Sequence, residues 1–191
     1  MTKSQTRRVI LFNKPFNTLC QFTGEAGDST LADFIDCPDV YPAGRLDKDS
    51  EGLLVLTNDG RLQHRIANPA NKMPKTYWVQ VEGLAEDTAL EPLRRGISIQ
   101  NYRTRPARVA ILEEPAVWPR IPPIRERRKI PTSWLEITLR EGKNRQVRRM
   151  TAAIGLPTLR LIRVRIGDWD LEGLLPGQYR SLDTDKPFTR L

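Results

Sequence analysis

Sulfur and imidazole side chains are scarce in this chain. Its 191 residues include only two cysteines, Cys20 and Cys37, and one histidine, His64. Two cysteines are too few for a disulfide framework, and their spacing is not that of metal ligands. A single histidine argues against a zinc site or a histidine-based catalytic triad. We therefore expect reduced thiols, and we expect His64 on the surface of a short helix.

Long apolar runs are also missing. No segment approaches the length of about 20 residues that a membrane-spanning helix needs. The first residues, MTKSQTRRVILF, are basic but contain no apolar core long enough for a signal peptide. No basic amphipathic helix with a clean apolar face stands out. We expect a soluble, cytoplasmic protein without a membrane partner.

Acidic residues are in the minority. The chain has 31 Lys and Arg against 23 Asp and Glu, which gives a formal charge of +8 and a pI near 9.9. Such an excess favours a polyanionic partner, because each phosphate that is neutralised releases counterions. Nucleic acid is therefore the leading class of partner. The length allows one sizeable core or two small subdomains.

The most informative stretch runs from 44 to 60 and reads GRLDKDSEGLLVLTNDG. Residues 53–56 are four consecutive aliphatic residues, which suit a strand that is covered on both faces. Four charged residues lie directly before this strand: Arg45, Asp47, Asp49 and Glu51. Charged groups beside so apolar a run either face water or carry chemistry.

Three interpretations of this charged cluster compete. The first is a solvated loop, because these residue types commonly form turns. The second is a calcium loop, but the twelfth position is Asn58 instead of a bidentate Glu, so the match fails. The third is a catalytic carboxylate, Asp47, held ionised by Arg45 or another guanidinium.

The whole stretch resembles the catalytic motif of the RsuA family of pseudouridine synthases. That motif consists of GRLD, two variable residues, Thr or Ser, one more residue and GLLLLTNDG. By this resemblance Asp47 is the essential aspartate. The resemblance extends through residue 182 and begins too early in the chain for the N-terminal S4 RNA-binding domain that many relatives carry.

The rest of the chain predicts an α+β fold. Alternating or aliphatic patterns predict strands at 9–12, 53–56, 75–82, 97–100, 105–112, 133–140 and 159–167. Helical patterns follow the caps at 28–30 and 58–60, cover 85–95 despite Pro92, and place Val147, Met150 and Ile154 on one stripe. Together with the resemblance, these elements predict a pseudouridine synthase fold. We expect a mixed, mainly antiparallel sheet with flanking helices in a single catalytic domain, 1–191, whose two subdomains surround a central active-site cleft.

Two further segments resemble family motifs. The alternation in KTYWVQVEG makes Tyr77 a core aromatic by default, whereas the resemblance implies that Tyr77 stacks on the flipped base and takes its C5 proton. In the segment NKP, which includes Asn13 and Lys14, the resemblance implies a structural or an RNA-contacting role; we assign both residues to substrate binding.

The remaining site residues come from the segments EGKNRQVRRM and LRLIRVRIG. In the family, an arginine of QVRRM pairs with the catalytic aspartate; we assign this role to Arg148, with Arg149 as the alternative. Arg145 and Arg149 are assigned to substrate binding. Leu161, or Ile162, is expected to wall the base pocket. The resemblance also implies that Arg45 fills the space that the flipped base leaves, or contacts flanking phosphates.

The segment 115–132 is the most irregular. It contains five prolines and five cations, the latter being Arg120, Arg125, Arg127, Arg128 and Lys129. The prolines exclude regular structure, and the cations make the segment either a solubilising loop or an RNA-contacting arm. We favour the RNA-contacting arm.

The resemblance implies an isomerase that converts a specific uridine of ribosomal RNA, in 23S rRNA, to pseudouridine. The C1′–N1 bond breaks and the base rejoins through C5, with Asp47 as the nucleophile. The base that leaves is also the incoming nucleophile, so no second carboxylate, metal or cofactor is needed. We expect a monomer. Two alternatives are a non-catalytic rRNA-binding or ribosome-assembly protein and a metal-dependent nuclease that uses Asp47, Asp49 and Glu51.

Overall fold

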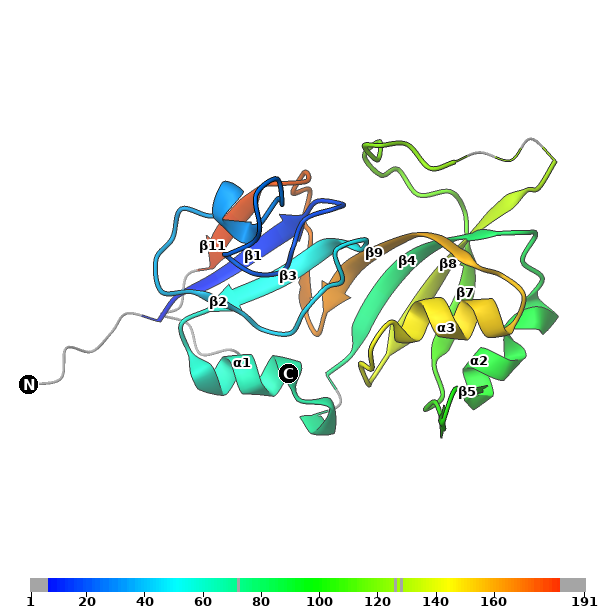
Figure 1. Cartoon of the computed structure of the whole chain (residues 1–191). Coiled ribbons are helices and arrows are strands. Elements are labelled where there is room, and N and C mark those ends of the chain that lie inside the picture. The colour runs from blue at the N-terminus through cyan, green and yellow to red at the C-terminus, as the bar shows by residue number, and fades with distance from the viewer. Residues whose placement is uncertain (1–6, 72, 126, 128, 183–191) are drawn as a thin grey trace, which may run out of the picture.

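The computed structural model describes residues 7–71, 73–125, 127 and 129–182 (Figure 1). Within these residues the chain forms one large sheet, a small hairpin and short helices. The strands of the large sheet are β1 (Val9–Lys14), β2 (Tyr41–Pro42), β3 (Glu51–Thr57), β4 (Lys75–Glu82), β7 (Arg108–Leu112), β8 (Thr132–Leu139), β9 (Thr158–Ile166), β10 (Trp169–Asp170) and β11 (Tyr179–Leu182). The hairpin consists of β5 (Ser98–Ile99) and β6 (Tyr102–Arg103), and the α-helices are α1 (Gly60–Ala67), α2 (Glu91–Arg95) and α3 (Gln146–Ala153). Three 3₁₀ turns complete the elements: η1 (Leu31–Asp33), η2 (Pro69–Asn71) and η3 (Asp87–Leu90).

The large sheet has the strand order β11-β1-β3-β9-β4-β8-β7, with β2 beside β3 and β10 beside β9. Every pair is antiparallel except β3 with β9. In Figure 1 the strands β1, β3 and β11 lie on one side of β9, and β4, β8 and β7 lie on the other. The predicted α+β fold with a mixed, mainly antiparallel sheet is confirmed.

The central strand β3 is buried at every position, as its aliphatic run predicts. It meets β9 over only two register pairs, Glu51 with Ile162 and Gly52 with Arg163. A Cβ atom at Gly52 would lie 2.3 Å from the Arg163 carbonyl oxygen, and the φ of Gly52 is +104°. Only glycine permits both this backbone conformation and so close an approach of the two strands.

The strand β4 has the predicted bounds and alternation. Tyr77, Val79 and Val81 are buried, and they join side chains of β8, α2 and α3 in one apolar cluster. Figure 1 shows α2 and α3 on the same face of this part of the sheet. Elsewhere, α1 places Leu62 and Ile66 inward and leaves His64 exposed, as predicted.

Three element predictions need correction. The helical segment 85–95 splits into η3 and α2, because Pro92 occupies the first turn of α2, where its missing N–H costs nothing. The strand predicted at 105–112 begins at Arg108: the Arg105 N–H donates to the Glu141 carboxylate, and Pro106 has no N–H for a ladder. The predicted connection 101–104 contains β6.

The segment 113–131, which we call the arm, contains no helix or strand among its described residues. Its predicted cation Arg128 lies outside the described residues. Among the helices of the described chain, none has the length and apolar character required to cross a bilayer.

Candidate active site

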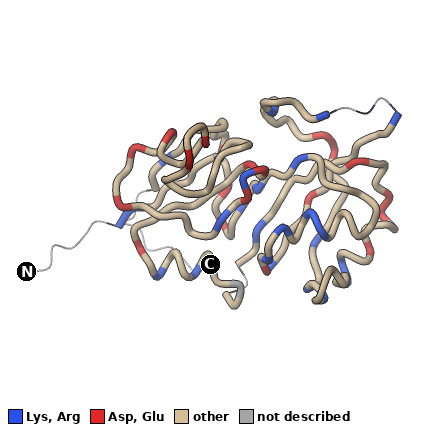
Figure 2. Tube along the Cα trace, in the orientation of Figure 1, with Lys and Arg blue, Asp and Glu red and all other residues tan. Residues whose placement is uncertain are grey.

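Asp47 lies in a cavity of about 700 Å³ at the junction of the two parts of the sheet. The wall is built by the loop 44–50, by β4 and β9, and by the loop that precedes α3. The site residues that the structure brings together here are Arg45, Asp47, Tyr77, Arg145 and Leu161. Figure 2 shows Lys and Arg on the segments around this junction, including α3 and the loop before it.

Tyr77 and Asp47 reach the cavity from different segments. Because side chains alternate along β4, Tyr77 projects into the cavity while Trp78 projects from the opposite face of the sheet. Tyr77 is 8% exposed and also belongs to the apolar cluster, so it is a core aromatic and a cavity wall at once. The two residues therefore lie on the same side of the sheet.

The arginine that faces Asp47 is Arg145. Its Nη1 lies 3.6 Å from Asp47 Oδ2, and its two terminal nitrogens donate to the two Asp49 oxygens at 2.9 and 2.8 Å. Arg148 donates to the Asp49 carbonyl oxygen at 2.7 Å and lies 3.4 Å from the Asp49 carboxylate. The ion pair of Asp47 in this structure is therefore with Arg145, while Arg148, for which the pair was predicted, contacts Asp49.

The backbone conformation at Arg145 explains why Arg145, and not Arg148, faces Asp47. Arg145 has a φ of +51°, the left-handed conformation, at the residue directly before α3. Its side chain thereby reaches across to the loop 44–50, whereas Arg148, one turn later, is held at the loop backbone. The hydrogen bonds from Arg145 hold the pKa of Asp49 below its usual range.

Three other predicted site residues do not line the cavity. Arg149 donates to the Asn144 side chain at 3.0 Å. Asn13 and Lys14 are 0% exposed: Asn13 donates to the carbonyl of Leu174, and Lys14 donates to those of Pro15 and Thr18. Side chains so enclosed cannot touch RNA, so the assignment of Asn13 and Lys14 to substrate binding is corrected to a structural role.

Glu51 does not lie at the mouth of the strand with the other charges. It is 2% exposed and accepts two hydrogen bonds from Arg160, at 2.9 and 2.8 Å. It also accepts one from the Trp118 indole at 2.8 Å, and Arg160 in turn donates to the Trp118 carbonyl. This buried cluster, which the sequence did not reveal, ties the arm to the first residue of β3.

Lys75 is a further cavity residue that sequence reasoning missed. It is 8% exposed, and burial together with the nearby Arg163 lowers its pKa to about 8. A signal was present, because Lys75 shares the inward face of the alternating strand with Tyr77, Val79 and Val81. A lysine at an inward position of such a strand indicates a wall of a cavity rather than a core position.

Lys14 and Lys75 predict how stability depends on pH. Burial lowers the pKa of each to about 8, below the unfolded value of 10.5. The unfolded chain therefore binds more protons between pH 8 and 10.5, and the free energy of unfolding rises with pH in that window. Relative to pH values well below 8, each lysine adds about 2 kcal/mol to the free energy of unfolding at pH 9.5. Well below pH 8 both states hold the proton, so the two lysines no longer make stability depend on pH.

Urea unfolding at intervals from pH 7.5 to 9.5 measures this rise. The Lys75→Met variant removes the Lys75 share, so its curve should be flatter by about half. A free energy of unfolding that stays level or falls over this range in the unmodified protein would contradict the lowered pKa values.

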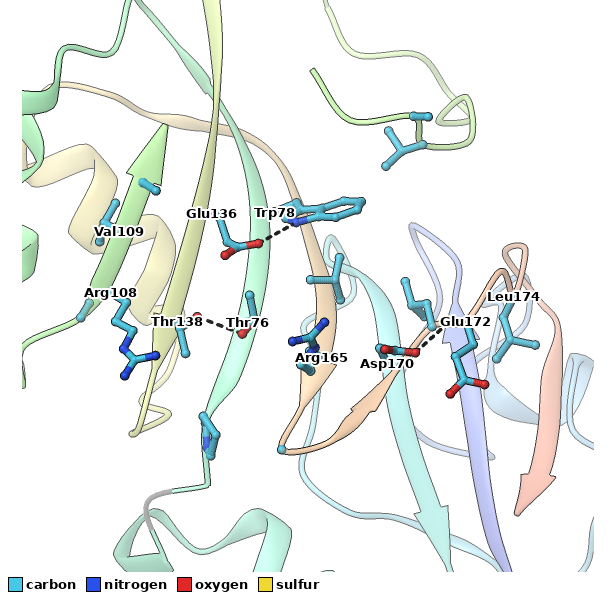
Figure 3. A pocket seen from close by; sticks show the side chains of 18 of the residues that line it. Thr76, Trp78, Arg108, Val109, Glu136, Thr138, Arg165, Asp170, Glu172 and Leu174 are labelled. Atoms are coloured by element: carbon cyan, nitrogen blue, oxygen red, sulfur yellow. Dashed lines mark hydrogen bonds between the residues drawn. The ribbon is translucent and has the colours of Figure 1, made fainter. Parts of the chain in front are cut away.

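A second cavity, of about 990 Å³, lies on the opposite face of the sheet (Figure 3). Its sheet wall carries Thr76 and Thr138, whose hydroxyls are 2.9 Å apart, and Trp78, which donates to Glu136 at 3.2 Å. Asp47 does not line it. The larger cavity is therefore separate from the predicted catalytic residue.

The carboxylates of the central motif are not arranged as metal ligands. Asp49 binds Arg145 and Arg148, and Glu51 binds Arg160. Among the residues that the structure describes, no group of three His, Cys, Asp or Glu side chains is placed to hold a metal ion. The motif therefore presents guanidinium-bound carboxylates beside one carboxylate, Asp47, that faces the cavity.

This fold and cavity define the class of protein. A crystal structure of a pseudouridylate synthase aligns with 96% of this chain and 73% of its own, with a TM-score of 0.77 and 31% sequence identity. The RNA pseudouridylate synthase family matches residues 8–153. The chain belongs to the RNA pseudouridylate synthase family, and it is therefore an isomerase.

Two curated relatives show which member of the family this chain resembles. A Vibrio vulnificus protein named ribosomal large subunit pseudouridine synthase E is 57% identical over 176 residues, which is 92% of this chain and 75% of the relative. A Xanthomonas axonopodis pv. citri protein of the same name is 56% identical over 171 residues, 88% and 90% of the two chains. The sequence resemblance to this member of the family, which segments such as NKPFNTLCQFT indicate, is confirmed.

Proposed function

We propose that this enzyme isomerises a specific uridine of 23S ribosomal RNA to pseudouridine. The proposal is supported by the names of relatives that are 54–57% identical to this chain over 88–93% of its length. The net charge of +8 suits a substrate with a dense phosphate backbone.

The single observation that carries the chemistry is the Asp47 carboxylate, which faces a cavity walled by Tyr77, Leu161 and Arg145. Uridine must leave the base stack before its C1′ is accessible, at a cost of a few kcal/mol. Asp47 then adds to the ribose, or takes a ribose proton to give a glycal, as the C1′–N1 bond breaks. The uracil turns within the cavity and rejoins C1′ through C5.

Each wall residue has a role in this proposal. Tyr77 stacks on the base and takes the C5 proton, and Leu161 confines the base while it turns. Arg145, instead of Arg148, is the cation beside Asp47. Arg45, which is exposed at the rim, contacts the flanking phosphates or fills the vacated stack.

The decisive experiment is incubation of 23S rRNA from cells that lack the enzyme with the purified protein and a chelator. Mass mapping of the RNA after labelling of pseudouridine should find one modified uridine. Strand cleavage that needs a divalent ion would indicate a nuclease instead. Binding without any modification would indicate a non-catalytic ribosome-assembly protein.

We further propose that the enzyme acts as a cytoplasmic monomer, with a single catalytic domain whose two subdomains meet at the cavity. The two-pair contact between β3 and β9, with separate apolar clusters to either side, supports this division. Light scattering of the purified protein, alone and with rRNA, tests the monomer.

The arm is proposed to contact RNA. Trp118 anchors its base to Glu51, and Arg120 stacks on Phe16 at 4.3 Å from the ring centroid. Beyond these anchors lie Arg125, Arg127 and Lys129, of which Arg127 pairs with Glu82 at 3.2 Å. The start of the arm is therefore held in place, and the cations beyond it are exposed, as a segment that contacts phosphates requires.

Replacement of Arg125, Arg127, Arg128 and Lys129 by Ser tests the arm. RNA affinity should fall, and the slope of log affinity against log salt should flatten by more than one unit, because each phosphate contact contributes about 0.7 to 0.9. Binding titrations between 50 and 300 mM salt measure the slope.

A matched variant that replaces Arg61, Arg95, Arg103 and Arg108 by Ser, four exposed cations outside the arm, separates local contact from loss of net charge. An unchanged slope in the arm variant would show that its cations only face solvent. RNA binding would then be reassigned to Arg145, Arg149 and the rim of the cavity, because Arg160 and Arg163 are buried.

A further inference from the structure

The wall of the cavity that contains Asp47 also holds a buried ammonium group, that of Lys75. Lys75 is 8% exposed and lines the cavity together with Asp47 and Tyr77. Within the part of the chain that the structure describes, its side chain donates no hydrogen bond and joins no ion pair. Burying an ammonium group without an acceptor is costly. Its place in a cavity wall therefore indicates an acceptor that enters with the ligand.

Lys75 reaches the cavity from the same face of β4 as Tyr77. The two residues are two positions apart on a strand whose burial alternates without interruption. Side chains so spaced stand on one face, about 7 Å apart along the strand. A base that stacks on Tyr77 therefore lies within reach of the lysine side chain.

A second buried cation, Arg163, lies near Lys75. Arg163 is 2% exposed, and it donates to the carbonyl oxygens of Leu53 at 2.8 Å and Arg45 at 3.3 Å. No carboxylate among the described residues pairs with it. Burial, together with the charge of Arg163, lowers the pKa of Lys75 to about 8. This part of the cavity thus favours a ligand that brings negative charge.

The proposed reaction produces such a charge. When the C1′–N1 bond breaks, its electron pair stays with the uracil, and the negative charge spreads over N1 and the carbonyl oxygens O2 and O4. The pair is used again when C5 joins C1′, and the C5 proton then moves to Tyr77. A donor held where charge develops stabilises the transition state more than it stabilises the bound uridine.

We propose that Lys75 is a catalytic residue, whose ammonium group donates a hydrogen bond to a carbonyl oxygen of the uracil and stabilises the anion formed when the C1′–N1 bond breaks. The ammonium group keeps its proton throughout. This inference rests on the proposed function, because it presumes that uridine is isomerised in this cavity.

The Lys75→Met variant tests the proposal, since it removes the cation and keeps most of the side-chain volume. The single-turnover rate constant on saturating RNA should fall about 100- to 1000-fold, the loss expected when one donor to a developing anion is removed. RNA affinity should stay nearly level. Lys75→Arg keeps a cation and should recover part of the rate. Arg61→Met removes one exposed cation on α1, and this control for net charge should keep the rate within threefold.

Sulfur in place of a uracil oxygen distinguishes direct contact from a structural role. RNA with 2-thiouridine or 4-thiouridine at the target position carries a weaker acceptor at one of the two carbonyl positions. One of these replacements should slow the unmodified enzyme, and the same replacement should cost Lys75→Met little more, because the hydrogen bond is already absent. If Lys75 only supported the fold, the losses from variant and substrate would multiply.

The pH profile gives a third readout. On subsaturating RNA the rate should fall above about pH 8, as Lys75 of the free enzyme loses its proton. This limb should be absent in Lys75→Met and should move to higher pH in Lys75→Arg, because a guanidinium keeps its proton. The other ionisable groups around the cavity stay the same in these variants: Cys20, Arg45, Asp47, Lys48, Asp49, Tyr77, Lys143, Arg145 and Arg163.

Three results would overturn the proposal. They are a Lys75→Met rate within threefold of the unmodified enzyme, thio losses that multiply at both positions, and weaker RNA binding with an unchanged rate at saturation. The last would assign Lys75 to a phosphate contact. Failure of the proposed function is a different result, because the unmodified enzyme would then form no pseudouridine in 23S rRNA.

Discussion

Replacement of Asp47 by Asn is expected to abolish turnover while the protein folds and binds RNA as before. The variant keeps the shape of the side chain and removes only the carboxylate that we propose as the nucleophile. A nucleophile that is lost in this way costs at least about 10⁴-fold in rate, or roughly 5.5 kcal/mol in barrier. Single-turnover formation of pseudouridine on saturating RNA measures the loss.

The matched control is Asp168→Asn, the same chemical change at an exposed residue of the turn between β9 and β10. Its rate should equal that of the unmodified enzyme. Residual activity of Asp47→Asn within about tenfold, roughly 1.4 kcal/mol, would be too small a loss for a nucleophile. The assignment of Asp47 would then be wrong.

The second large effect concerns stability. Replacement of Glu51 by Ala leaves the Arg160 guanidinium, whose side chain is 6% exposed, buried without its carboxylate. Breaking a buried pair from one side costs about 3–5 kcal/mol. For a chain of this size, such a loss lowers the melting temperature by roughly 6–20 °C. Thermal and urea unfolding of the purified variant measure it.

Glu91→Ala is the matched control for Glu51→Ala. Glu91 pairs with Arg94 and Arg95 through a side chain that is 42% exposed, and exposed pairs contribute about 0–1 kcal/mol. Replacing both buried partners, by Glu51→Leu with Arg160→Met, should recover much of the lost stability, because no uncompensated charge remains. Equal losses of stability in Glu51→Ala and Glu91→Ala would mean that the buried pair stabilises the fold no more than an exposed pair does.

Periodic segments were predictable because one local rule governs them. In β4 the inward and outward positions alternate without interruption, and in β3 an aliphatic run leaves no alternative to burial on both faces. The motif around Asp47 was also recognisable, because its residues keep the order and spacing of the family motif. These features depend on residues that are close together in the sequence.

The arginine that meets Asp47 was not predictable for the opposite reason. Arg145 and Arg148 are three residues apart, and their order along the helix does not say which one reaches a loop almost a hundred positions earlier. The choice depends on the left-handed backbone at Arg145 and on the carbonyl of Asp49. Both are properties of the packed structure.

Burial of charge was misjudged in the same way. Glu51 was counted among charges that face water or carry chemistry, and Lys14 was assigned to substrate binding. Both partners of Glu51, Arg160 and Trp118, come from segments far away in the sequence, and one of the three carbonyls that Lys14 meets belongs to Lys48. Such long-range partners leave no local pattern in the sequence.

The triple contact of Glu51, Arg160 and Trp118 sets a rule for exchanging arms between members of the family. An arm grafted from another synthase will dock only if it brings an indole donor where Trp118 stands and meets a host that supplies both members of the buried pair. Glu51 is also the first residue of the strand that follows the loop with Asp47, so a poorly seated graft would disturb that loop as well. An arm can therefore be exchanged only between chains that share Glu51 and Arg160, or together with the two segments that carry them.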